Sequence, residues 1–160
     1  MKNRLMMILT IIVTVFTFTG CGDKTIDIAI ETVRAAVDAV APAEALPVMM
    51  EIDTAALKTY YGLGSDEVAA FSGQMPLLNV TAPEILIVHA QKNREEAVHQ
   101  ALSARLDTLM EQWSGGDATQ FALENDCRIV QNGDWLLLVI AESAEEIMNV
   151  FSACINSYKN

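Results

Sequence analysis

Apolar and polar residues follow two different periods along this chain, one typical of helices and one typical of strands. Helical spacing, with apolar side chains every three or four positions between charged ones, occurs in three stretches. These are residues 26–40, 93–114 and 143–158. Short apolar runs typical of strands are residues 46–52, 84–90, 125–131 and 134–141. The pattern predicts an α+β fold, a single small domain with helices packed on an antiparallel sheet.

The first helical stretch also fits a second period. Ile26, Ile28 and Ile30 alternate as they would in a strand. Five alanines between positions 29 and 41 favour a helix instead, and Pro42 ends it. We therefore expect a helix over residues 26–40.

Residues with known positional preferences mark the ends of other helices. Asp53 is suited to cap a short helix over residues 54–61, and Gly62 is suited to end it. Two capping boxes are expected, Asn93 with Glu96 and Ser143 with Glu146.

Asn132 and Gly133 separate two of the strand-like runs. Both residues tolerate the positive φ that a type I′ turn requires at its two central positions. The sequence therefore predicts a hairpin in which residues 129–131 pair with residues 134–136.

The runs at residues 84–90 and 134–141 are apolar on both faces, so neither face of their sheet can be left in water. We expect the long helix and the last helix to cover one face, and the first helix to cover the other. Whatever the first helix leaves bare is expected near Tyr60, Tyr61 and Trp135, which form the candidate contact surface. The alternative is that the helices seal both faces and no apolar patch remains.

The first 21 residues have the pattern of a lipoprotein signal. A basic start precedes an apolar run, residues 5–18, that is shorter than the roughly 20 residues needed to cross a bilayer. Gly20, a small residue, stands directly before the thiol of Cys21, which can accept a lipid. Phe18 stands where an aliphatic residue is usual, so ordinary signal cleavage and an uncleaved N-terminal anchor stay open as alternatives.

This reading divides the chain into three parts. They are a signal peptide at residues 1–20, a lipid-anchored N-terminus at residues 21–25 and a single α+β domain at residues 26–160. Acyl chains such as palmitate on Cys21 would hold the protein on the extracytoplasmic face of the cell membrane, since each buried CH₂ contributes about 0.8 kcal/mol.

The chain beyond the signal is strongly acidic. All 21 acidic residues follow Cys21, whereas two of the ten basic residues precede it, so the mature chain carries eight positive and 21 negative charges, a net charge of −13. Phosphates and anionic headgroups repel such a chain. Nucleic acid is therefore excluded as a partner, and the membrane contact is expected through the lipid on Cys21.

Candidate chemistry is sparse. Cys127 and Cys154 are an even pair that suits either a disulfide or two buried thiols. The sequence has no Cys-x-x-Cys motif or cysteine–histidine cluster, so no metal and no cofactor are expected. His89 on a strand and His99 on a helix could converge, but neither stands in a catalytic motif. Exposed or hydrogen-bonded histidines are expected, and no catalytic residue is assigned.

Short motifs recur in a fixed order over most of residues 26–158. They are Leu46-Pro47-x-Met49, Leu57-x-x-Tyr60-Tyr61-Gly62, Pro83-Glu84-Ile85, a helix with Arg105, then Asn125, Gly133 and a last helix with Phe151. With these motifs behind a lipidated cysteine, the chain resembles the small extracytoplasmic lipoproteins of Gram-positive bacteria that are catalogued as a domain of unknown function. The resemblance implies no activity.

Two functions from different classes follow from these observations. The first is a non-catalytic lipoprotein that binds another envelope protein, a wall component or a small ligand. The alternative is a small cell-envelope hydrolase with a site assembled from separated residues. That alternative requires a pocket in which His89 or His99 meets carboxylates, with strongly perturbed pKa values.

Overall fold

The computed structural model describes residues 28–41, 48–77, 83–114 and 127–159 of the 160-residue chain. In these ranges five strands form one sheet in the order β1-β2-β3-β5-β4, and every neighbouring pair is antiparallel. The strands are β1 (Met49–Glu51), β2 (Val68–Pro76), β3 (Glu84–Ala90), β4 (Cys127–Asn132) and β5 (Trp135–Ile140). The helices are α1 (Ile30–Asp38), α2 (Thr54–Tyr61), α3 (Glu95–Trp113) and α5 (Ala144–Ser157). The predicted α+β class is confirmed.

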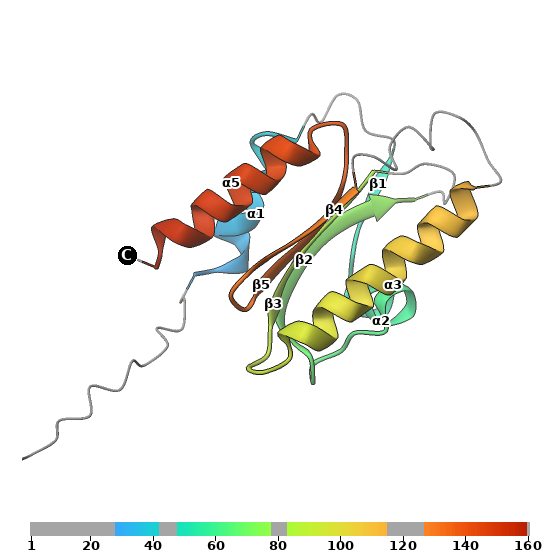
Figure 1. The fold of residues 1–160 in the computed structure, drawn as a ribbon, viewed down its shortest axis with the longest axis horizontal. Coiled ribbons are helices and arrows are strands. Elements are labelled where there is room, and N and C mark those ends of the chain that lie inside the picture. Colours follow the sequence, from blue (N-terminus) through green and yellow to red (C-terminus); the bar gives the residue numbers. More distant parts are fainter. Residues whose placement is uncertain (1–27, 42–47, 78–82, 115–126, 160) are drawn as a thin grey trace, which may run out of the picture.

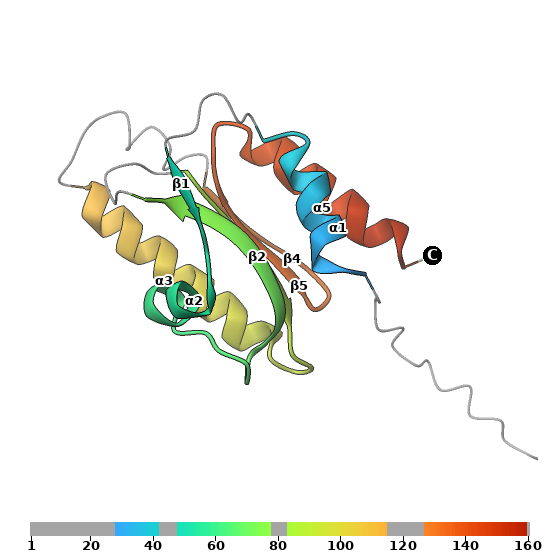
Figure 2. The same cartoon turned by 180° about the vertical axis from the view of Figure 1, so that it is seen from behind.

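The sheet lies between two layers of helices (Figures 1 and 2). On one face, α2 and α3 pack over Leu86, Val88 and Leu136, which we call the α2/α3 core. On the other face, α1 and α5 pack over Ile87, Leu137 and their neighbours, the α1/α5 core. Successive side chains of β3 and β5 alternate between these two cores, and all six residues of β5 are buried. The prediction that both faces of these strands are covered is confirmed.

The prediction for the last helix is wrong. We expected it to share a face with the long helix, but α5 packs beside α1 and α3 packs beside α2 (Figure 1). The periodicity of a helix identifies its buried stripe, but it does not identify the surface that the stripe meets. Because both faces of β3 and β5 are apolar, either face could have accepted α5.

The first helix covers the second face of the sheet, as predicted. Val33 and Val37 point into the α1/α5 core and are fully buried. Arg34 holds the helix from its side, donating to Ser72 Oγ on β2 at 3.2 Å and to Glu51 Oε2 on β1 at 3.4 Å. The segment that contains α1 therefore belongs to the folded domain.

Only some of the predicted helix ends have the expected contacts. Asp53 caps α2 by accepting from the Ala56 amide at 2.7 Å, and Gly62 ends that helix at φ +69°. Neither predicted capping box forms. The N-cap of α3 is Arg94 and not Asn93, and Ser143 is the N-cap of α5, as predicted, but makes no side-chain cap hydrogen bond. Asn93 lies in the loop, two residues before α3 begins at Glu95, and has a φ of +62°. No described helix is both long and apolar enough to cross a bilayer.

The predicted hairpin exists with a shifted turn. Asn132 pairs with Trp135, so the two loop residues are Gly133 and Asp134 instead of Asn132 and Gly133. Of the described non-glycine residues only Asn93 has a positive φ, so Gly133, at φ +69°, is the one loop residue with this conformation. That arrangement belongs to a turn with glycine at its first central position, not to a type I′ turn. Gln131 consequently pairs with Leu136.

The burial of α1 predicts that its apolar face is needed for stability. Val33→Asp should lower the free energy of unfolding by about 3 kcal/mol or more, because it places an unpaired charge in the α1/α5 core. Thr32→Asp, at the exposed neighbouring position, should change it by less than about 0.5 kcal/mol. Denaturant unfolding measures both.

Deleting residues 25–41 should produce a chain that aggregates or binds a hydrophobic dye. A truncated chain that stays monomeric, dye-silent and equally stable would reduce α1 to a tether.

Candidate functional site

A buried polar cluster joins α2, β3 and α3. Glu84 opens β3, and Arg105 lies in the middle of α3, and these are the two buried charged residues in the described part of the chain. Tyr61, the last residue of α2, is buried beside them. The three side chains lie at the α2/α3 side of the sheet.

Glu84 receives three hydrogen bonds. Arg105 donates through Nη2 to Oε2 at 2.7 Å and through Nε to Oε1 at 3.2 Å. Tyr61 donates its hydroxyl to Oε1 at 2.6 Å. This bidentate guanidinium–carboxylate contact has a fixed geometry and is stronger than a hydrogen bond between neutral groups.

Two aromatic rings flank the guanidinium group of Arg105. Its central carbon lies 5.2 Å from the ring centre of Tyr60 and 5.7 Å from that of Tyr61. These distances are within the range of a cation–π attraction. Tyr60 is 41% exposed, so one side of the buried cluster reaches the surface through its ring.

The surroundings raise the pKa values of two residues of the cluster, Tyr61 and Arg105. Burial, and then the charge and hydrogen bond of Glu84, hold the pKa of Tyr61 far above its ordinary value. Burial would lower the pKa of Arg105, but the hydrogen bonds and charge of Glu84 outweigh it, and the pKa is raised. Tyr61 is therefore a neutral donor and Arg105 a permanent cation. The cluster binds three elements together, α2, β3 and α3.

The two histidines do not converge. His89 stacks on Trp135 in the α1/α5 core, with ring centres 4.5 Å apart and an interplanar angle of 4°, and its Nε2 lies 3.0 Å from Asp134 Oδ2. His99 is on α3, across the sheet, where its Nδ1 lies 3.5 Å from Ser103 Oγ. Each is thus a hydrogen-bonded histidine in separate surroundings.

The structure does not bring together the three residues of the contact surface predicted from the sequence. Trp135 is fully buried in the α1/α5 core, and Tyr61 is buried in the α2/α3 core, on the opposite face of the sheet. Of the three predicted residues only Tyr60 is exposed. The helices cover the parts of the two faces where Trp135 and Tyr61 lie.

The cysteines Cys127 and Cys154 are both thiols. Cys127 belongs to the α2/α3 core and Cys154 packs against the α1/α5 core, so the sheet separates them. Of the two alternatives, the disulfide is therefore not formed. Burial raises the pKa of the Cys154 thiol. No group of three potential metal ligands occurs among the described residues, and Cys21 lies outside those residues.

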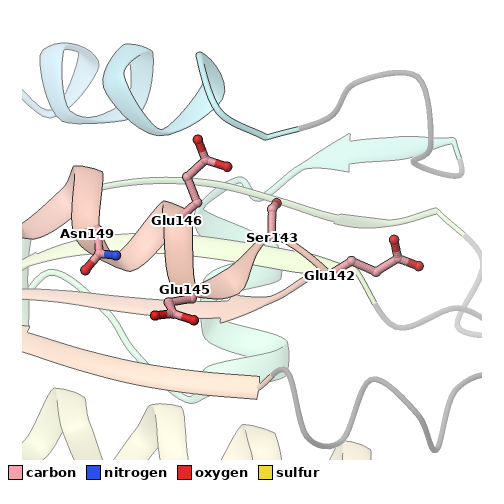
Figure 3. Close-up of a pocket in the computed structure, with 5 residues that line it drawn as sticks. All are labelled: Glu142, Ser143, Glu145, Glu146 and Asn149. Atoms are coloured by element: carbon pink, nitrogen blue, oxygen red, sulfur yellow. The ribbon is translucent and has the colours of Figure 1, made fainter.

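A shallow acidic hollow lies where α5 begins. Glu142, Ser143, Glu145, Glu146 and Asn149 line it (Figure 3). The three carboxylates point in different directions in Figure 3, so they do not converge on one ligand. No histidine lines this hollow.

A five-stranded antiparallel sheet between two helical layers, with a guanidinium–carboxylate pair buried under one of them, defines the structural class. Residues 43–141 match the model of the family described as Domain of unknown function (DUF4358), and the chain belongs to this family. The matched segment includes Tyr61, Glu84 and Arg105, whereas α1 precedes it and α5 follows it. No curated protein and no solved structure matches the chain.

The sequence contains a signal for the buried cluster that the apolar periodicity alone does not reveal. The buried stripe of α3 consists of Val98, Leu102, Arg105, Leu109 and Trp113. Leu106, the apolar residue directly after Arg105, is only partly buried. Arg105 follows Leu102 by three positions and precedes Leu109 by four, which is helical core spacing. A charged residue at such a position requires a buried partner.

The cluster predicts a strong dependence of Arg105 on Glu84. Arg105→Met should destabilise the domain by about 3–5 kcal/mol, because it leaves the Glu84 carboxylate buried and uncompensated. Adding Glu84→Gln should restore part of that loss, since a neutral amide still accepts the Tyr61 hydroxyl. Arg94→Met, the same change at an exposed position just before α3, is the control. Denaturant unfolding compares these variants. Equal stability of the Arg105 and Arg94 variants would contradict the assigned role.

Proposed function

We propose that this chain is a lipid-anchored extracytoplasmic lipoprotein of the Gram-positive type, and that its domain is a non-catalytic binding module. The observation that carries the anchor is the N-terminal pattern, a basic start, a short apolar run and a small residue before Cys21. The lipid on Cys21 makes the membrane contact. The folded domain faces the outside of the cell membrane.

The buried polar groups support a binding role over catalysis. Glu84, Arg105 and Tyr61 satisfy one another inside the domain, and neither tyrosine nor arginine can exchange protons near neutral pH. The hydrolase alternative required His89 or His99 in a pocket with carboxylates. His89 has one carboxylate neighbour, Asp134, but its ring is stacked on Trp135 and the two histidines lie across the sheet from each other.

Exposed apolar side chains favour a protein partner over a small ligand. Val48 and Leu77 are 73% and 57% exposed, and they lie together where the Leu77 amide donates to the Val48 carbonyl at 2.9 Å. We call them the β1/β2 apolar pair. Small-molecule sites are concave and enclose most of their ligand, whereas an exposed apolar pair is buried by contact with a second surface. With a net charge of −13, the chain favours a neutral or basic partner.

The anchor predicts the fate of a Cys21→Ala variant. Wild-type protein should incorporate a fatty-acid analogue and sediment with membranes, because the Cys21 thiol is the acceptor. The variant should lose the label and be either released to the medium or held as a larger precursor. A double Cys127→Ala and Cys154→Ala variant should keep the label. Unchanged labelling and mobility of the Cys21→Ala protein would exclude this anchor.

The binding role predicts a partner that depends on the β1/β2 apolar pair. Acylated protein, cross-linked in native membranes, should capture a protein that a Val48→Asp, Leu77→Asp variant captures about tenfold less, equivalent to about 1.4 kcal/mol. Tyr158→Asp, at another exposed apolar residue, is the control and should capture as much as wild type. If no protein is captured in a manner that depends on the pair, this surface is not the binding site.

A further inference from the structure

The geometry points to one end of the domain as the surface that lies against the bilayer. This membrane-facing end consists of the last turn of α5, the β4–β5 turn at Gly133 and Asp134, and the β3–α3 loop at residues 91–94. The inference rests on the proposed lipid anchor at Cys21 and extends it to the orientation of the domain.

The length of chain between the anchor and the fold sets the first limit. Ile28 is buried in the α1/α5 core and stands seven positions after Cys21. Seven residues span at most about 25 Å when fully extended. Ile28, two residues before α1 begins, is therefore held within about 25 Å of Cys21, whatever the conformation of the tether.

The position at which the chain enters the fold selects one end of the domain. In Figures 1 and 2 the first turn of α1 lies beside the last turn of α5. That turn of α5 is joined to the β4–β5 hairpin, where Asn132 Nδ2 donates to Asn156 Oδ1 at 3.1 Å and Lys159 donates to Asn132. His89, at the end of β3, pairs with Trp135 at the same end of the sheet. These segments share one end of the molecule with the start of α1.

Placing the opposite end of the domain against the bilayer would stretch the tether to nearly its full length. Glu84 pairs with Ile140 at that end of the sheet, and α5 begins there at Ala144. The 14 residues of α5 extend over about 21 Å. Turning the far end toward the bilayer would carry the start of α1 away by a comparable distance, which nearly exhausts the reach of the tether.

The exposed side chains of the membrane-facing end suit a headgroup region. Tyr158 is 50% exposed, and Lys92, Arg94 and Lys159 are exposed as well. Tyrosine and long basic side chains lie readily between an apolar layer and water. Asp66 and Asp134 occupy the same end, so the orientation comes from the short tether and not from attraction to anionic lipids.

Energy transfer to labelled lipid tests the orientation. The acylated full-length mature protein carries Cys127→Ala and Cys154→Ala, with a donor dye on either Tyr158→Cys or Glu145→Cys, in phosphatidylcholine vesicles that contain an acceptor-labelled lipid. Transfer from position 158 should be at least about twofold higher than from position 145, because about 20 Å of α5 separates them. Equal or reversed transfer from vesicle-bound protein overturns the orientation.

A tether variant and the vesicle binding itself separate the possible failures. Inserting 20 Gly/Ser residues after Gly22 adds a flexible chain with an end-to-end distance of about 25 Å, so the difference between the two positions should disappear while vesicle binding persists. A difference that survives the insertion overturns the assignment of the orientation to the tether. Absence of vesicle binding would overturn the lipid anchor and, with it, the orientation.

Discussion

The structure depends on two central strands, β3 and β5, that are apolar on both faces. Leu86 and Leu136 face α2 and α3, whereas Ile87 and Leu137 face α1 and α5, and all four are fully buried. At about 25 cal/mol per Å² of apolar surface, an uncovered face of such a sheet would cost more than the net stability of a small domain. The family segment, residues 43–141, contains the five strands but only one of the two helical layers, that of α2 and α3. The second layer comes from α1 and α5, which lie outside it.

The Glu84–Arg105 pair fixes how the first layer sits on the sheet. Burying two charges costs much of what their attraction returns, so the pair contributes little net stability as a whole. Its geometry is nevertheless specific, because the guanidinium must meet the carboxylate in one plane while Tyr61 donates to the same carboxylate. A rotation of α3 would leave a buried charge unpaired, and a displacement of α2 would remove the hydrogen bond that Tyr61 donates to Glu84. We interpret the cluster as the contact that sets the register of both helices on β3.

The sequence predicted the elements better than their arrangement. β3 has the predicted bounds, Glu84–Ala90, and the two-faced burial of β3 and β5 follows from apolar residues at successive positions. The face chosen by α5 could not be predicted, since both faces offered similar apolar surface. The hairpin turn was misplaced because Asn132 and Gly133 both suit a positive φ. In the structure Asn132 pairs with Trp135 in the β4–β5 ladder, and of these two residues only Gly133 has a positive φ. The buried cluster was missed because helical periodicity was assigned from apolar residues alone. Arg105 is a charged residue in the middle of the buried stripe of α3.

The α1 helix has two roles that cannot be varied independently. It covers one face of the sheet through Val33 and Val37, and it is the first part of the fold after the proposed anchor at Cys21. A segment that served only as a tether could be long and polar without cost to the domain. Here the tether could be lengthened only by unwinding α1 from its N-terminal end, and this would uncover part of the α1/α5 core. With the proposed anchor at Cys21, the distance of the domain from the membrane would therefore be limited by the stability of its own core.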